Sequence, residues 1–307
     1  MARGRWSIDV LADHSPSTTI INDVTLTAEP AIDYLVIGHV ARDVTPSGPR
    51  LGGTAAFAAL TARALGHRPA VVTAAATDLD LTPLAGIPCA CSLSPQSTTF
   101  ENRYDGHRRR QRLLGRAAAL TAADVPEAWR AASLVQLGPI AGEIEPSWAD
   151  SYPHSGLLGV TAQGWLRAWG EDGVVRPRPW TWARQGLAAA DAVVVSLDDL
   201  GGDEVAVEEM AAVCRLLVVT EGARGVTVHW NGDVRRVPGT PAAQVVDSTG
   251  AGDVFATAFF SRLRATRDPW EAARFANALA AVSVTRPGLE GIPTANEIRR
   301  ADLQVVR

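Results

Sequence analysis

The segment DSTGAGD at residues 247–253 is followed directly by VFATAF at residues 254–259. The second segment is apolar with a helical period, so it predicts a helix that begins close to the two glycines. Backbone N–H groups at a helix N-terminus have no partner in the helix and attract anions, and glycines allow an anion to approach closely. We therefore predict an anion hole formed by the amides of Gly250, Ala251 and Gly252.

Asp253 stands at the end of this glycine loop. Beside a bound phosphate, its carboxylate could accept a proton from an attacking hydroxyl while the amides stabilise the charge of the transferred group. An acid in the first turn of a helix also favours the helix without any catalytic role. For an isolated Gly-x-Gly-Asp that structural interpretation is preferred, but the seven residues together favour the catalytic one.

Short runs rich in Val, Ile and Leu recur along the chain. The first, residues 32–38, ends at a glycine, as a buried parallel strand would. Segments compatible with helices separate most of the runs, an order typical of stacked βαβ units. We therefore predict an α/β fold with a mainly parallel sheet, whose further strands lie at residues 70–75, 134–137, 157–160, 192–197 and 216–220.

Two segments interrupt this order. Residues 43–51 contain two prolines and a glycine, and in residues 97–115 the letters YDGH separate two strand-like runs and predict a β-hairpin. Together they could form a lid over the carboxyl edge of the sheet, where ligands bind in open α/β folds. The lid would carry a basic cluster that consists of Arg108, Arg109, Arg110 and Arg112. These arginines either keep an exposed strand face in contact with water or bind a phosphate or an acidic partner.

The composition limits the classes of partner. A net charge of −4 and a pI near 5.9 argue against nucleic acid. No apolar run reaches the roughly 18 residues of a membrane span, and residues 1–30 lack a secretory signal, so we expect a cytoplasmic protein. Those 30 residues show no clear period, and we treat them as an N-terminal extension of unknown role.

Lysine is absent from the sequence, and three cysteines are present. Without lysine there is no Walker A motif and no Schiff-base lysine, so phosphate must be bound by arginine, backbone or metal. Cys89, Cys91 and Cys214 provide neither a disulfide framework nor the second ligand pair of a zinc site. We expect buried or inactive thiols.

The whole segment DSTGAGDVFATAF resembles the signature of the ribokinase/PfkB carbohydrate kinase family, Asp-Thr-x-Gly-Ala-Gly-Asp followed by a helix; Ser248 replaces the usual threonine. The resemblance implies a ribokinase-like three-layer α/β/α sandwich over residues 31–307, with a small β lid at about 43–51 and 97–115. It also implies that Asp253 is the general base and that the Gly250–Gly252 amides form the anion hole.

Further matches imply the acceptor and nucleotide contacts. LGGTAAFAALTARALG at residues 51–66 resembles the family's glycine pair that opens a helix, which assigns Gly52 and Gly53 to the substrate. Asp43 has the spacing from Gly38 of the family's hydroxyl-binding aspartate. The segments 218–225 and 274–293 resemble the nucleotide-binding regions, which makes the expected nucleotide contacts Thr220, Gly222, Gly225 and Asn277, together with Gly250 and Gly252.

The family's Asn-x-x-Glu motif, which supports magnesium through water, is replaced here by Ser196-Leu197-Asp198-Asp199. Asp199 can still act in the outer shell of Mg²⁺, which keeps several waters. Asp247 corresponds to a residue near a monovalent-cation site in the family, which leaves activation by K⁺ open.

The resemblance implies an ATP-dependent kinase that transfers the γ-phosphate of Mg-ATP to a hydroxyl of a sugar, polyol or nucleoside. Within the family, the short lid connection and the STTFEN run at residues 97–102 resemble polyol or inositol kinases more than ribokinase proper, so myo-inositol is the first acceptor to test. The lid near residues 100–103 and Gln163 are further pocket candidates, and Trp165 suits either the pocket or the core. We expect a monomer or homodimer with small-molecule partners only, without nucleic acid or membrane.

Two alternatives come from other classes. A non-catalytic sugar or nucleotide sensor with a kinase fold would explain the departures at Ser196 and Asp199, although the intact Asp253 argues against it. An NAD-binding enzyme is disfavoured because the last glycine of G-x-G-x-x-G is missing after Gly252.

Overall fold

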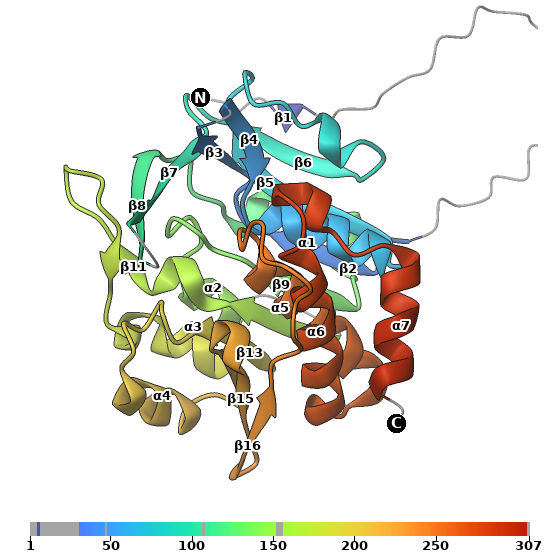
Figure 1. Ribbon diagram of the computed structural model, residues 1–307. Coiled ribbons are helices and arrows are strands. Elements are labelled where there is room, and N and C mark those ends of the chain that lie inside the picture. The colour runs from blue at the N-terminus through green and yellow to red at the C-terminus, as the bar shows by residue number, and fades with distance from the viewer. Residues whose placement is uncertain (1–4, 7–30, 47, 106–107, 152–155, 306–307) are drawn as a thin grey trace, which may run out of the picture.

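A ten-stranded sheet forms the centre of the protein (Figure 1). The computed structural model describes residues 5–6, 31–46, 48–105, 108–151 and 156–305. In the order in which they lie across the sheet, the strands are β1 (Arg5–Trp6), β6 (Cys89–Leu93), β5 (Pro69–Ala75), β2 (Tyr34–Ile37), β9 (Leu134–Leu137), β10 (Leu157–Thr161), β13 (Ala192–Ser196), β14 (Leu216–Thr220), β15 (Gly225–Trp230) and β16 (Asp233–Pro238).

In this spatial order, the seven neighbouring strands that begin with β6 and end with β14 are parallel to one another. Strand β1 at one end of the sheet, and β15 and β16 at the other, are antiparallel to their neighbours. All six runs expected to be strands are strands of this sheet, which confirms the mainly parallel arrangement. The hairpin of β15 and β16 at one end of the sheet was not predicted from the sequence.

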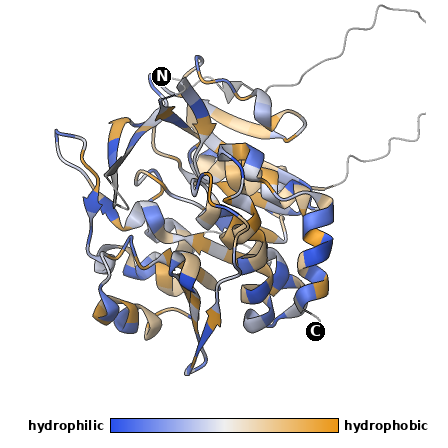
Figure 2. Cartoon of the chain, viewed as in Figure 1, coloured by the Kyte–Doolittle hydropathy of each residue, from blue (hydrophilic) through white to orange (hydrophobic). Residues whose placement is uncertain are grey.

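Helices cover both faces of the sheet because successive strand residues point to opposite sides. In β2, Tyr34 and Val36 belong to one buried cluster, and Leu35 and Ile37 belong to the other. The first cluster packs against α1 (Thr54–Ala64), α5 (Ala251–Thr266), α6 (Pro269–Ser283) and α7 (Ala295–Val305), and the second against α2 (Ser147–Ser151), α3 (Arg184–Ala189) and α4 (Glu204–Ala211). The three-layer α/β/α prediction is therefore confirmed, and the outermost helix, α7, is mostly hydrophilic (Figure 2).

A second, four-stranded sheet begins where β2 ends. Its strands, in spatial order, are β4 (Gly48–Gly52), β3 (Ala41–Thr45), β7 (Thr98–Asp105) and β8 (Arg108–Gly115). The hairpin expected within residues 97–115 is the antiparallel pair β7–β8, and residues 43–51 contain strand pairing between β3 and β4 where only a connection was expected. We refer to this four-stranded sheet as the lid.

The basic cluster of the lid lies only partly within the described side chains. Those of Arg108, Arg109 and Arg110 are outside them. Arg112 donates to the backbone oxygen of Asp172 at 3.0 Å and lies 4.0 Å from Glu101, so its contacts are with the protein itself.

Of the N-terminal extension, Arg5 and Trp6 pair with Ser92 and Cys91 at the edge of the sheet, and the other residues before 31 lie outside the described part. All three cysteines are described and are free thiols. Within the described residues, no helix has the length and apolar character needed to cross a membrane.

Candidate active site

The glycine loop begins helix α5, as expected. Gly250 is the N-cap with φ 78°, and a side chain there would also overlap the ring of Phe57, so this position requires glycine. A Cβ built on Gly252 meets nothing within 4 Å, so there is open space beside its backbone. The N–H of Ala251 donates to the Ser248 carbonyl at 3.2 Å, which makes the amides of Gly250 and Gly252 the stronger candidates to bind an anion.

Asp253 lies in the first turn of α5 and is held by a residue from another helix. The hydroxyl of Thr54, at the start of α1, donates to Asp253 Oδ1 over 2.6 Å. Gly53, the N-cap of α1, has φ 82°, and a Cβ there would lie 2.7 Å from the carbonyl oxygen of His39. The glycine pair therefore lets α1 start close enough to the sheet edge for Thr54 to reach Asp253.

Asp43 extends from lid strand β3 towards the same region. Asp43 and Arg50 are cross-strand neighbours in the β3–β4 pair, and a side chain on Gly52 would overlap the Asp43 carboxylate. The absence of a side chain at Gly52 thus leaves room for that carboxylate. Asp43 lines one cavity together with Gly53 and Asp253.

This cavity has a volume of about 140 Å³ and lies between the lid, the start of α5 and the carboxyl ends of the central strands. A larger cavity of about 890 Å³ adjoins it and shares the walls formed by Asp43, Phe57, Asn102, Ser248 and Thr249. The lid also contributes Phe100 and Gln111 to the smaller cavity, and β10 and the residues after it contribute Thr161, Gln163 and Arg167. Trp165 does not line it; its side chain is fully buried in the core, and its ring N–H donates to Ile144 O at 2.7 Å.

Asp199 also lines the smaller cavity, with Ser196 and Thr220. Nη2 of Arg167 donates to Asp199 Oδ1 at 3.1 Å, and the two side chains are only 8% and 13% exposed. The candidate for the outer shell of magnesium is therefore already paired with a cation through one of its oxygens.

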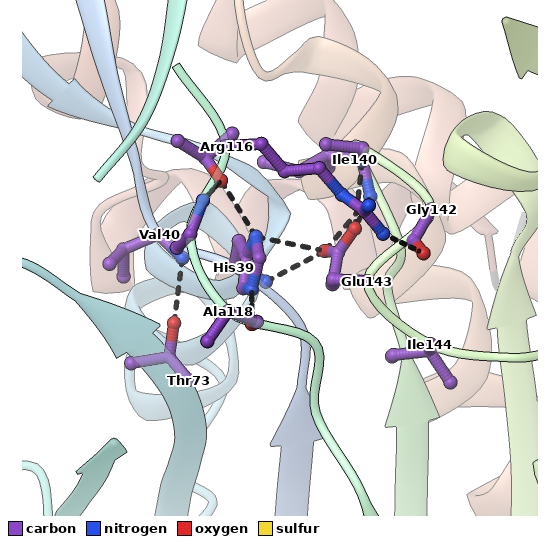
Figure 3. Close-up of polar contacts among 12 residues, drawn as sticks. His39, Val40, Thr73, Arg116, Ala118, Ile140, Gly142, Glu143 and Ile144 are labelled. Atoms are coloured by element: carbon purple, nitrogen blue, oxygen red, sulfur yellow. Dashed lines mark hydrogen bonds and ion pairs between the residues drawn. The ribbon is translucent and has the colours of Figure 1, made fainter. Parts of the chain in front are cut away.

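A buried cluster around His39 fixes the base of the lid (Figure 3). The fully buried His39 follows β2, and its backbone N–H donates to Glu143 Oε1 at 2.9 Å. Glu143 also accepts the backbone N–H groups of Ile140, at 3.0 Å, and Ala141, at 2.7 Å, so three amides stabilise this buried carboxylate. These hydrogen bonds connect the segment after β2 to the segment after β9. His39, at their centre, lies four residues before Asp43.

The protonation of His39 follows from its neighbours. Nε2 lies 2.9 Å from Ala118 O, which can only accept, so Nε2 carries the proton. Thr98 Oγ1 accepts the Ala117 N–H and donates its own proton to Nδ1 over 2.7 Å. Burial lowers the pKa of His39 from 6.5, and the nearby Glu143 carboxylate opposes this shift. The imidazole is therefore neutral at pH 7.

Asp247 connects the glycine loop to the segment after α6. Its Oδ1 accepts the Thr249 N–H at 2.9 Å and its Oδ2 accepts the Gly288 N–H at 3.0 Å. Both carboxylate oxygens thus hold backbone amides, and a monovalent cation nearby would depend mainly on carbonyl oxygens.

The expected nucleotide contacts are not all brought together. Thr220 lines the smaller cavity at the end of β14, whereas Gly222, Gly225 and Asn277 line neither cavity. Gly225 has φ 99°, and a side chain there would overlap the backbone of β16. Asn277 donates to Pro238 O at 3.1 Å, so α6 is tied to the end of β16.

A magnesium ion at this site would have few ligands from the described side chains and would depend on substrate phosphates and water. Among the described residues, no group of three or more His, Cys, Asp or Glu side chains is placed to hold a metal ion. Asp199 Oδ1 contacts Arg167, and no contact with Oδ2 is seen in the described part of the chain. A carboxylate oxygen that acts through water suits Mg²⁺, which usually retains several waters.

Comparisons with known proteins agree with this fold. The family model for pfkB family carbohydrate kinases matches residues 171–295. Inositol 3-kinase of Oryza sativa subsp. japonica is 30% identical over 288 residues, covering 84% of this chain and 70% of that protein. Ribokinase of Bacillus subtilis is 39% identical over 92 residues, which are 30% of this chain and 31% of that protein.

A solved structure shows the same fold over most of the chain. It is described as a pyrophosphate-dependent kinase in the ribokinase family, complexed with a pyrophosphate analog and myo-inositol. The TM-score is 0.73 with 22% identity, and the match covers 87% of this chain and 99% of the other.

The fold is the ribokinase-like fold, and α5 begins at the glycine-rich loop. This chain belongs to the pfkB family of carbohydrate kinases. The match to the rice enzyme spans most of both proteins, while the match to the Bacillus ribokinase spans about a third of each.

Three residues around the cavity were not singled out from the sequence. Thr54 had a signal, since it directly follows the Gly52-Gly53 pair. Glu143 and Arg167 had none, because their partners lie 104 and 32 residues away and no local motif links them.

Proposed function

We propose that this protein transfers the terminal phosphate of ATP to a hydroxyl group of a sugar, polyol or nucleoside. The observation that carries the proposal is the position of Asp253: Thr54 holds its carboxylate, and it lines one cavity together with Gly250, Gly252 and Asp43. This arrangement supports the assignment of a base, an anion hole and an acceptor-binding carboxylate to one space, as phosphoryl transfer requires.

In the proposed reaction, Asp253 accepts the proton of the acceptor hydroxyl as its oxygen attacks the terminal phosphorus. The bond between that phosphorus and the bridging oxygen breaks in line, and ADP leaves. The amides of Gly250 and Gly252 stabilise the charge on the transferred group, with Ala251 as the third member of the loop. The products are a phosphate monoester and ADP.

The acceptor would bind between the lid and α1, where Asp43, Gly52 and Gly53 lie. The cavity lining includes hydroxyls, amides and a carboxylate, which suit a ligand with several hydroxyl groups: Asp43, Asn102, Gln111, Thr161 and Gln163. Phe57 and Phe100 also line the cavity. We take myo-inositol as the first acceptor to test because the rice inositol 3-kinase matches over 84% of the chain.

The donor would extend from the glycine loop towards β14. ATP is the proposed donor, with Thr220, Gly222, Gly225 and Asn277 as nucleotide contacts. Bound magnesium would neutralise charge on the donor phosphates. Asp199 would contact a water molecule bound to the magnesium ion. A K⁺ ion near Asp247 would affect the glycine loop without taking part in the reaction. Pyrophosphate is the second donor to test, since the similar structure is that of a pyrophosphate-dependent kinase.

We further propose that the enzyme works in the cytoplasm as a monomer or homodimer on small molecules, without nucleic acid or membrane partners. The net charge of −4 supports the exclusion of nucleic acid.

The test is a product assay with two donors. Release of ADP or phosphate is measured over a panel of sugars, polyols and nucleosides with Mg-ATP and with magnesium pyrophosphate, each with and without K⁺. Acceptor-dependent turnover with ATP is expected, most strongly with a polyol. Binding of the panel without turnover by either donor would favour the sensor alternative and contradict the proposal.

A further inference from the structure

Arg167 is a buried cation in the wall of the candidate active site. Its side chain is 8% exposed, and arginine is rarely buried so deeply unless it is paired. Among the described residues that line the smaller cavity, Arg167 is the only arginine and no histidine is present, and the sequence contains no lysine. It therefore supplies the only cationic side chain seen in that wall.

The backbone around Arg167 is held in place by several contacts. Strand β11 (Arg167–Ala168) pairs antiparallel with β12 (Arg176–Pro177), and the N–H of Arg178 donates to Leu166 O at 2.8 Å. The preceding residue, Trp165, is fully buried. The guanidinium thus extends into the cavity wall from a rigid support, which is what a preorganised binding group needs.

Stability alone does not explain the pair of Arg167 and Asp199. A buried ion pair is often no more stabilising than apolar residues of the same volume, because both charges lose water. A charged ligand would explain such a pair. Asp199 balances the charge of Arg167 when the site is empty, and the guanidinium can bind an anionic ligand when one is present. A guanidinium carries five N–H groups in a planar fork, and the contact with Asp199 uses Nη2.

The order of the strands indicates which of the two substrates, donor or acceptor, Arg167 would contact. Arg167 follows β10, Asp199 follows the neighbouring β13, and Thr220 ends β14, the next strand along. Asp43 lies on the lid, which begins after β2, on the other side of β10. Helix α5 packs on β10, where Gly159 leaves room for the ring of Phe260. The guanidinium of Arg167 therefore reaches Asp199, on the side of the sheet where β14 ends at Thr220, while the segment that follows Arg167 pairs with lid strand β8.

We propose that Arg167 binds the phosphate groups of the phosphoryl donor at the end that is transferred. This assignment rests on the proposed kinase function. The planar guanidinium can donate two parallel hydrogen bonds to phosphate oxygens, whereas a lysine would offer only a point charge. Together with the amides of Gly250 and Gly252, it would hold the terminal phosphate from two sides and stabilise the charge of the transition state.

The test compares ligands that differ only in their phosphates. Calorimetric titrations with ATP, ADP, AMP, adenosine and inorganic pyrophosphate are made in magnesium buffer on the wild type, Arg167→Gln and Arg167→Lys. For Arg167→Gln we expect at least about tenfold weaker binding of ATP and pyrophosphate, a smaller loss for AMP and no loss for adenosine. Arg167→Lys keeps the charge and should lie between Arg167→Gln and the wild type.

The matched control is Arg262→Gln. Arg262 is also partly buried, with 22% exposure, and pairs with Glu271 at 2.7 Å and Asp302 at 2.9 Å away from the cavity. This variant should lose stability but bind ATP as the wild type does. If Arg167→Gln does not fold, Arg167→Lys, which can still pair with Asp199, carries the comparison.

Two results would overturn the assignment of Arg167: unchanged binding of ATP and pyrophosphate in Arg167→Gln, or an equal loss of ATP and adenosine. If the wild type turns over in the product assay while Arg167→Gln binds as the wild type does, only the Arg167 assignment fails. A wild type that neither binds nor uses any donor would contradict the proposed function and this assignment with it.

Discussion

The hydroxyl of Thr54 donates to Asp253 Oδ1 over 2.6 Å, which joins the first residue of α1 to the first turn of α5 across 199 positions of sequence. The contact fixes the direction in which the Asp253 carboxylate faces the cavity. It makes Thr54 a positioning residue for the proposed base.

Replacing Thr54 by valine should lower kcat by roughly tenfold to a hundredfold, because a hydrogen bond to a charged group contributes about 1.5–3 kcal/mol. The KM values for donor and acceptor should change little, since valine keeps the shape of this buried side chain. Thr54→Ser should restore most of the rate. Steady-state kinetics would contradict the positioning role if serine and valine behaved alike.

The two glycines of the loop should respond differently to alanine. Gly252→Ala places a methyl group in open space at a helical position, so the protein should unfold at the same or a slightly higher temperature while the donor KM rises. Gly250→Ala should unfold at a lower temperature, because φ is 78° and the methyl group would overlap Phe57. Thermal denaturation and kinetics on both variants check this. A Gly252→Ala enzyme with the wild-type donor KM would show that no phosphate lies beside that residue.

His39 should make the stability of the protein depend on pH. Burial lowers its pKa in the folded state below 6.5, so the unfolded chain takes up a proton first as the pH falls. The free energy of unfolding should therefore decrease as the pH drops below about 6.5, by at most about 1.4 kcal/mol per pH unit from this one group.

Urea denaturation between pH 5 and pH 8 measures that slope in the wild type and in His39→Gln. The variant should be less stable at pH 8, where its hydrogen bonds to Thr98 and Ala118 are impaired, and its slope should be shallower. Some slope will remain because burial also lowers the pKa of His67 and His229. Equal slopes in the two proteins would mean that folding does not lower the pKa of His39.

The three thiols should react slowly in the native protein. Burial raises the pKa of Cys89 to about 12, that of Cys91 to about 11 and that of Cys214 to about 12, so little thiolate forms at pH 8. A colorimetric thiol reagent should label them slowly in buffer and rapidly in denaturant, where all three are counted. Rapid native labelling of any one would contradict its raised pKa.

Strands buried on both faces could be predicted well from the sequence. The runs at 134–137 and 216–220 coincide with β9 and β14, because a strand covered by helices on both sides must be apolar throughout. The hairpin β15–β16 was missed, although Asn231 and Gly232, both with positive φ, form the Asn-Gly turn that typically joins two such strands. In β15, Val226 and Val228 are buried and alternate with less buried residues, a pattern that the nucleotide-loop interpretation of residues 218–225 obscured.

The candidate site was predictable where its chemistry is local. The glycine loop and Asp253 lie within seven residues, and the helix that presents them follows directly. The Arg167–Asp199 pair and the His39–Glu143 contact depend on which strand ends become neighbours, and that is set by the order of the strands in the sheet. Sequence spacing contains no such information, so these contacts became visible only in the folded chain.

The most direct measurement is the turnover of Asp253→Asn with Mg-ATP and the best acceptor of the panel. Asparagine can still accept the Thr54 hydrogen bond, so the fold should survive, and Asp233→Asn, an exposed acid at the β15–β16 turn, is the matched control. We predict that Asp253→Asn loses about a thousandfold in kcat while binding ATP like the wild type. A kcat within tenfold of the wild-type value would contradict the assignment of Asp253 as the base.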